Sequence, residues 1–107
     1  MENNKPVPVL CIYRIKDGKE REFRALLDRH YPTLTKLGLA SPKPPQIWRS
    51  VTREGKLVFI ELYEWKNAES VNLAHQTPEL MQVWEPMGAL ADGMEFLNVE
   101  SLPQAGR

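Results

Sequence analysis

The sequence predicts an α+β domain whose elements follow the order β-α-β-β-α-β. Three observations support this prediction. Apolar runs of strand length lie near both ends of the chain, helical spacing of apolar residues follows the first and third of the strands, and only a short turn separates the two middle strands. At 107 residues the chain has the length of one domain. The order is that of the ferredoxin-like split arrangement, in which a four-stranded antiparallel sheet carries both helices on one face.

The first strand is expected over residues 7–15, where β-branched and other apolar residues follow one another almost without interruption. Residues 1–6 form a polar leader without the features of a signal peptide, so a cytoplasmic location is expected. The single domain is assigned to residues 7–102. Residues 103–107 are expected to form a disordered tail.

The first helix is predicted to begin with the D-x-x-E capping box of Asp17–Glu20 and to end at Gly38, since glycine commonly follows a helix. Pro32 is expected to kink it, because proline lacks a backbone N–H and crowds the carbonyl four residues earlier. The apolar face repeats at steps of three and four and consists of Phe23, Leu26, Leu27, His30, Tyr31, Leu34 and Leu37.

Two further strands are predicted over residues 46–53 and 56–65, joined by a tight turn at Glu54-Gly55. The second of these strands is apolar on both faces, although the helices can cover only one face of the sheet. A second copy of the chain is the simplest cover for the other face. The pattern therefore predicts a homodimer that associates through the sheet.

The second helical segment is predicted in two pieces. Asn67 caps a short helix that runs to about His75, and Thr77-Pro78 begins the next helix, because Thr suits the N-cap and Pro suits the first helical position. The buried face of the longer helix is expected to contain Leu80, Met81, Trp84, Met87 and either Leu90 or Ala91.

The last part of the chain is predicted to contain a kink at Pro86, a helix end at Gly93 and a strand over residues 94–100. This strand completes the four-stranded sheet.

The composition argues against several classes of function. Fourteen basic residues balance fourteen acidic ones, which does not suit a nucleic-acid-binding protein, and no apolar run reaches the roughly 18 residues of a membrane span. Two distant histidines and one cysteine give no metal-ligand spacing, and there is no glycine-rich phosphate loop or nucleophile motif. The lone Cys11 is interpreted as a small core residue rather than a reactive thiol.

Two histidines are candidates for proton chemistry. His75 is the candidate catalytic residue, because an imidazole titrates near neutral pH and the predicted end of the short helix can present it to a pocket beside the sheet. Its alternative role is a partly buried histidine that hydrogen-bonds within the helix break. His30 lies on the apolar face of the first helix and is interpreted as a packed core histidine.

Glu61 and Glu64 are three residues apart on one strand and therefore point to opposite faces, which excludes a catalytic pair. Glu61 shares its face with apolar residues and needs a partner if it is buried. Arg14 or Arg49 on neighbouring strands is the expected partner, in a structural ion pair at the dimer interface.

The aromatic residues have two possible uses. Trp48, Trp65 and Trp84, together with Tyr13, Tyr63 and Phe59, can line an aromatic pocket or can serve only as core and interface. The sequence leaves both alternatives open.

With the order of elements established, one stretch resembles a known family. A strand ending in Glu64-Trp65-Lys66-Asn67, a short alanine-containing helix with Leu73-Ala74-His75, and the helix start Gln76-Thr77-Pro78 are similar to the antibiotic biosynthesis monooxygenase domain of the dimeric α/β-barrel superfamily. The resemblance covers residues 7–102.

This resemblance implies two protomers with their sheets face to face in a barrel, each with a pocket between sheet and helices. It implies an oxygenase that needs no cofactor and acts on a small aromatic or quinol-like substrate, which itself supplies the electrons to dioxygen. His75 is then the base that forms the phenolate. The implied substrate-binding residues are Tyr13, Trp48, Trp65 and Trp84.

Two alternatives are retained. The chain can be a non-catalytic dimeric barrel that binds a small apolar molecule. It can also be a heme-binding variant, but heme-degrading members use an asparagine on the first strand and a histidine further along the second helix. Neither is present, since residues 7–15 contain no asparagine and no histidine follows His75.

Overall fold

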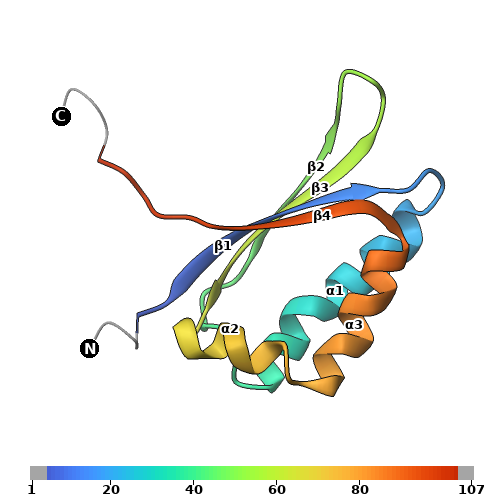
Figure 1. Ribbon diagram of the computed structural model, residues 1–107. Coiled ribbons are helices and arrows are strands. Elements are labelled where there is room, and N and C mark those ends of the chain that lie inside the picture. Colours follow the sequence, from blue (N-terminus) through green and yellow to red (C-terminus); the bar gives the residue numbers. More distant parts are fainter. Residues whose placement is uncertain (1–4, 104–107) are drawn as a thin grey trace.

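The computed structural model describes residues 5–103 and confirms the predicted order of strands and helices (Figure 1). Four strands form one antiparallel sheet in the order β2-β3-β1-β4. Residues 1–4 of the predicted leader and residues 104–107 of the predicted tail lie outside the described part of the chain. The strands are β1 (Val7–Ile15), β2 (Gln46–Val51), β3 (Leu57–Trp65) and β4 (Ala91–Asn98), and the helices are α1 (Glu20–Lys36), α2 (Ala68–Ala74) and α3 (Pro78–Ala89).

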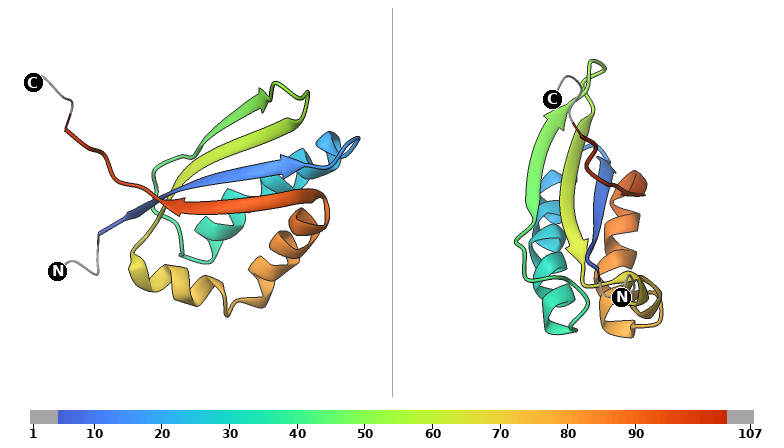
Figure 2. Two further views of the ribbon diagram at one scale, coloured as in Figure 1. Left: turned by 45° about the horizontal axis from the view of Figure 1, so that its top comes forward. Right: turned by 90° about the vertical axis from the view of Figure 1, so that its left-hand side faces the viewer.

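The helices α1 and α3 lie side by side against one face of the sheet, and α2 closes one end of this helical layer (Figure 2). Residues in β1 and β3 alternate between two environments, as the pleat of a strand requires. Odd-numbered residues of both strands point toward the helices and are mostly buried, whereas most even-numbered residues point to the other face and are less buried. We call that second face, which none of the helices within residues 5–103 covers, the open face of the sheet.

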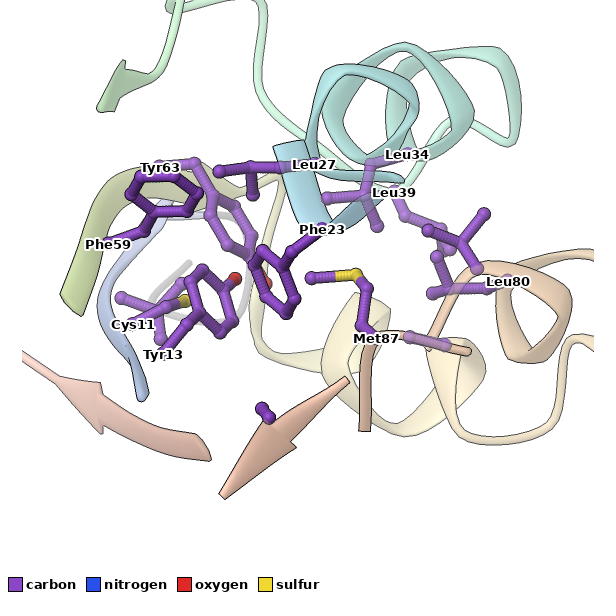
Figure 3. Packing of buried hydrophobic residues seen from close by; sticks show 14 of the residues in the cluster. Cys11, Tyr13, Phe23, Leu27, Leu34, Leu39, Phe59, Tyr63, Leu80 and Met87 are labelled. Atoms are coloured by element: carbon purple, nitrogen blue, oxygen red, sulfur yellow. The ribbon is translucent and has the colours of Figure 1, made fainter. Parts of the chain in front are cut away.

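The core fills the space between the sheet and the helices α1 and α3 (Figure 3). The helices contribute Phe23, Leu27 and Leu34 from α1 and Leu80 and Met87 from α3. Val83 completes the buried face of α3 in place of the predicted Met81, and Trp84 is only partly buried. Cys11 has no exposed surface, which agrees with its interpretation as a core residue.

The start of α1 differs from the prediction, whereas its end agrees with it. Lys19 is the N-cap, and no side chain of the described part of the chain caps the helix, so Asp17 does not form the predicted capping box. At the C-terminal end Gly38 has φ +74° and is followed by Leu39, whose N–H donates to the Leu34 carbonyl. The Gly38 N–H donates to the Thr35 carbonyl. These two bonds make the Schellman motif that glycine permits after a helix.

The prolines predicted to kink the helices do not interrupt them. The helix α1 continues through Pro32 and α3 continues through Pro86. Each proline removes one backbone donor, and the hydrogen bonds of the surrounding turns keep the helical conformation.

Two predicted boundaries in the strands also need correction. The strand β2 ends at Val51 and β3 begins at Leu57, so residues 52–56 connect them. In this connection the Gly55 N–H donates to the Thr52 carbonyl and Gly55 has φ +80°. Gly93 was expected to end a helix but lies within β4 opposite Arg14, next to a β-bulge at Asp92. The helix α3 already ends at Ala89, because the chain turns into the sheet at Ala91.

The open face of the sheet carries apolar side chains with partial exposure. Leu10 and Ile12 of β1, Ile60 and Leu62 of β3, and Leu97 of β4 lie on it, and Trp48 of β2 is 46% exposed there. None of the helices described in the structure is long and apolar enough to cross a membrane.

Candidate ligand pocket

A cavity of about 290 Å³ lies on the helix side of the sheet, at the end closed by α2. Strands β1, β3 and β4 form its floor, and α2, its C-cap and α3 form its sides. Its surface is mostly apolar, with a histidine and an asparagine as the polar groups best able to orient a ligand. We refer to it as the aromatic pocket, and its lining residues are Val9, Tyr63, Trp65, Val71, His75, Trp84, Met94, Phe96 and Asn98.

A larger hollow of about 350 Å³ lies on the open face, where its lining includes Lys43, Leu62 and Glu64. None of its described lining residues is a histidine or a tryptophan. The open face is also the expected dimer surface. The aromatic pocket is therefore the better candidate for a functional site.

Trp84 is the central aromatic residue of the pocket. The centroid of its indole ring lies 5.5 Å from that of the His75 ring, 6.4 Å from that of Trp65 and 6.5 Å from that of Phe96. The ring planes of Trp84 and Trp65 are nearly perpendicular, at 85°, which is a favoured geometry for aromatic pairs. The structure thus brings the predicted Trp65, Trp84 and His75 together in one site.

His75 reaches the pocket because α2 is short and well capped. The side chain of Asn67 accepts a hydrogen bond from the Ser70 N–H, as predicted, and the helix ends with His75 as its C-cap. The Thr77 hydroxyl donates to the Leu73 carbonyl instead of capping α3. The Thr77 hydroxyl therefore supplies a hydrogen-bond donor for a carbonyl at the C-terminal end of α2. The His75 ring lies at the exposed rim of the pocket.

Behind the Trp84 wall lies a buried chain of polar side chains. The Trp84 indole Nε1–H donates to Nε2 of His30 at 2.9 Å, and Nδ1 of His30 lies 3.0 Å from Oε1 of Glu61. The Tyr13 hydroxyl donates to the same Glu61 oxygen at 2.7 Å. His30 is therefore a core residue, as predicted, and it also touches the wall of the pocket.

The predicted partners of Glu61 are wrong. Arg14 pairs with Glu95 and Arg49 with Glu20, both at the surface, while Glu61 has no exposed area. Glu61 points toward the helices, so it does not lie at the expected dimer interface. Arg14 and Arg49 were expected because they lie on neighbouring strands, but the side chain of His30 enters this layer from α1 and is the partner of Glu61.

Burial changes the acidity of the hydroxyl and thiol groups around Glu61. Desolvation, followed by the charge of Glu61, raises the pKa of Tyr13 well above its usual value. Desolvation also raises the pKa of Tyr63, and it raises that of the Cys11 thiol to about 12. These groups stay protonated at neutral pH and do not act as anionic nucleophiles.

The other predicted wall residues lie outside the pocket. Tyr13 is fully buried under the site, next to Phe96, with ring centroids 6.1 Å apart. Trp48 pairs with Ile60 in the β2–β3 register and therefore lies on the open face. Trp48 cannot line the aromatic pocket, because the sheet separates the two.

Sequence reasoning missed several lining residues. Met94, Phe96 and Asn98 alternate along β4 and all point toward the helices. The predicted strand over residues 94–100 contains all three, but only the register with β1 shows which of its faces points toward the helices. Within residues 5–103 no group of three or more His, Cys, Asp or Glu residues has the arrangement of a metal site.

The chain matches no protein-family model and no curated protein sequence. Its fold matches solved structures closely. A mutant of SnoaB, a cofactor-independent oxygenase from Streptomyces nogalater, superimposes with a TM-score of 0.69 at 14% identity, covering 95% of this chain and 98% of that one. A structure described as an antibiotic biosynthesis monooxygenase gives a TM-score of 0.66 at 14% identity, covering 91% and 99%.

A dimeric protein of unknown function with a ferredoxin-like fold, from Bacteroides fragilis, gives a TM-score of 0.68 at 10% identity, covering 90% of this chain and 96% of that chain. The chain thus has the ferredoxin-like fold of antibiotic biosynthesis monooxygenase structures, as its sequence predicts.

Proposed function

We propose that the chain is a cofactor-independent monooxygenase of a small aromatic or quinol-like substrate, which binds in the aromatic pocket. The observation that carries the proposal is the position of His75 at the rim of a pocket walled by Trp65, Trp84 and Phe96. The fold shared with SnoaB, a cofactor-independent oxygenase, supports the same function.

The size and lining of the pocket favour a planar aromatic ligand. A volume of about 290 Å³ is near the lower end of ligand sites, which span roughly 300–1,000 Å³, and suits two or three fused rings. Aromatic rings of the substrate can stack on Trp84 or meet Trp65 edge to face. The side chains of His75 and Asn98 can bind phenolic hydroxyl or carbonyl groups on the substrate.

The proposed chemistry uses electrons from the substrate alone. For a substrate of the anthrone type, His75 takes the proton of the phenolic tautomer. The resulting electron-rich anion reacts with dioxygen at the ring carbon that is a CH₂ group in the keto tautomer, and a C–O bond forms. The O–O bond then breaks, one oxygen atom stays on that carbon as a carbonyl, and the other leaves as water. The CH₂ carbon loses four electrons and dioxygen gains four, so the conversion of CH₂ and O₂ to C=O and H₂O is balanced.

The test is oxygen uptake with anthrones, which carry such a CH₂ carbon, comparing the wild type with His75→Ala. General-base catalysis contributes about 10²–10⁴-fold, so His75→Ala is expected to lose activity by that factor. Gln76→Ala is the matched control, because Gln76 is the exposed neighbour of His75 and does not line the pocket. When the reaction is run under ¹⁸O₂, one ¹⁸O atom is expected in the product carbonyl and the other in water.

Absence of turnover above background across these substrates contradicts the enzyme proposal. Equal loss in His75→Ala and Gln76→Ala contradicts the role of His75, because it indicates a general effect on α2.

A second candidate function is non-catalytic binding of a small apolar molecule in the same pocket. The exposure of His75 favours it, because water at the rim can solvate the ring and compete with a substrate for its nitrogens. Tight binding of a naphthol without oxygen uptake supports this alternative over the oxygenase.

The open face supports a homodimer. Leu10, Ile12, Ile60 and Leu62 form a contiguous apolar centre on it, since their strands are adjacent and in register. Two such faces placed together remove these side chains from water. Sedimentation at micromolar concentration is expected to give a dimer, and Ile60→Glu a monomer, because it places a charge at that centre. Gln82→Glu, on exposed α3 surface, is the control. A monomeric wild type contradicts the dimer.

A further inference from the structure

The deepest polar group behind the aromatic pocket is the His30–Glu61 pair. Both side chains are completely buried, and they come from different elements, α1 and β3. Their hydrogen bonds continue outward to Trp84, a partly exposed wall residue. Apolar side chains would pack this part of the core at a lower cost, because burying a carboxyl and an imidazole costs free energy.

The donors and acceptors of this chain fix its direction. An indole N–H is a donor only, so Nε2 of His30 must accept the hydrogen bond from Trp84. Nδ1 then carries the imidazole proton and donates it to Oε1 of Glu61. A doubly protonated ring would turn two N–H groups toward each other at the Trp84 contact. The geometry therefore selects the neutral Nδ1–H tautomer of His30.

Glu61 is suited to hold this tautomer. Its Oε1 atom accepts hydrogen bonds from both the Tyr13 hydroxyl and the His30 ring. The hydrogen bond from Tyr13, which lies on β1, holds this oxygen in position opposite His30. The His30 ring also lies 5.3 Å from Tyr63 in a perpendicular arrangement, with an interplanar angle of 89°. Contacts with Glu61 and Tyr63 of β3 thus limit rotation of the ring and leave Nε2 directed at the indole.

We propose that His30 is a positioning residue for the pocket: oriented by Glu61, its Nε2 atom binds the Trp84 indole and fixes the wall against which a ligand and His75 pack. Trp84 has two ring faces and one N–H. The single hydrogen bond to His30 sets which way the indole plane is turned between His75 and Trp65. This inference requires a ligand pocket but does not rest on catalysis.

The test uses the indole N–H signals in ¹H–¹⁵N spectra of the full chain. The three tryptophans give three signals, and Trp84→Phe identifies the one from Trp84. The Trp84 signal of the wild type is expected downfield, as for a hydrogen-bonded donor. In His30→Phe, which keeps a ring but has no acceptor, it is expected to move upfield and to exchange with solvent about tenfold faster.

His30→Gln is the conservative rescue variant, because its side-chain oxygen can accept from Trp84 while its NH₂ group donates to Glu61. It is expected to restore the downfield signal. Binding of 1-naphthol, measured by calorimetry, is expected to weaken about tenfold in His30→Phe and to recover in His30→Gln. If His30 serves only the packing of the core, the indole signal and naphthol binding do not follow this pattern, and the proposal is overturned.

A direct measurement on the wild type keeps the proposal testable if His30→Phe does not fold. Long-range ¹H–¹⁵N spectra of the imidazole rings distinguish the two neutral tautomers. The Nδ1–H form of His30 supports the proposal, and the Nε2–H form or a doubly protonated ring at pH 7 overturns it. None of these readouts depends on turnover, so failure of the oxygenase proposal remains distinguishable from failure of this one.

Discussion

The Tyr13 hydroxyl donates a 2.7 Å hydrogen bond to Oε1 of Glu61, between two side chains that have no exposed surface. Tyr63 lies two residues beyond Glu61 on the same strand and is almost as buried, yet its hydroxyl has no hydrogen-bond partner within the described residues. The two tyrosines thus have nearly equal burial but opposite states of hydrogen bonding.

Tyr13→Phe is expected to lower the free energy of unfolding by about 1–3 kcal/mol, because it removes a donor to a buried carboxyl oxygen. Tyr63→Phe is the matched control and is expected to be neutral or stabilising, since the hydroxyl that it removes is buried without a partner. Urea unfolding followed by circular dichroism measures both. Equal destabilisation by the two variants contradicts the role assigned to the Tyr13 hydroxyl.

Filling the aromatic pocket from α2 is expected to abolish ligand binding. Val71 lines the cavity of about 290 Å³, and Val71→Trp replaces a small side chain with an indole that extends into it. We expect 1-naphthol affinity to fall more than about tenfold, because the ligand and the new indole compete for one space.

Leu73→Trp provides the control for this change, because Leu73 is 46% exposed on the same helix and does not line the pocket. Its naphthol affinity, measured by the same calorimetry, is expected to equal that of the wild type. Unchanged affinity in Val71→Trp shows that the ligand binds elsewhere.

Two glycine-to-alanine changes are expected to have opposite effects on stability. Gly38 has φ +74°, where a Cβ atom costs roughly 1 kcal/mol, so Gly38→Ala is expected to destabilise although the space around it is open. Gly88 lies within α3, and an added Cβ meets the Met94 methyl at an ordinary 3.7 Å. Gly88→Ala is expected to stabilise by about 0.5–1 kcal/mol. Thermal unfolding compares them, and the same sign for both variants contradicts the assignment.

The Cys11 thiol is expected to react slowly in the folded protein. Its pKa of about 12 leaves on the order of one thiolate in ten thousand at pH 8, against about one in ten at the ordinary value of 9.0. Labelling with dithionitrobenzoate at pH 8 is therefore expected to be slow, and to become rapid in urea. Rapid labelling without urea contradicts the burial of Cys11.

The same pKa shift has a defined sign for stability. The pKa of Cys11 is higher in the folded protein, so its contribution to the free energy of unfolding is fully present below pH 9. This contribution is lost as the pH rises from 9 toward 12, because the thiol ionises in the unfolded chain but not in the native state. Cys11→Ala is expected to reduce this alkaline loss of stability, as measured by urea unfolding between pH 9 and pH 11. An unchanged pH dependence argues against the raised pKa.

The fold could be predicted because its local signals agree with one another. The apolar run of β1, the helical spacing of α1, the cap at Asn67 and the proline at the first position of α3 each specify the element that forms there. The wrong predictions concern residue types that are common both at helix ends and in other structures. Gly93 resembled a helix end but lies beside a strand bulge, and Asp17 resembled a cap but lies outside the helix.

The candidate site could be predicted only in part. Trp65, Trp84 and His75 come together as expected, because they lie on consecutive elements around one helix break. The sequence could not indicate that His30 and Glu61 meet, since they are 31 residues apart and their contact depends on how α1 lies across β3. Assigning Trp48 to a face required the β2–β3 register, which the loop length sets.

The alternation along β3 also bears on how the protein can be changed by substitution. Its odd-numbered residues, including Glu61, Tyr63 and Trp65, serve the pocket side, and its even-numbered residues Ile60 and Leu62 serve the open face. Replacing a residue of one set leaves the other set in place, so the proposed ligand binding and the proposed self-association can be altered separately. Inserting a single residue into β3 exchanges the two sets, and therefore damages both properties at once.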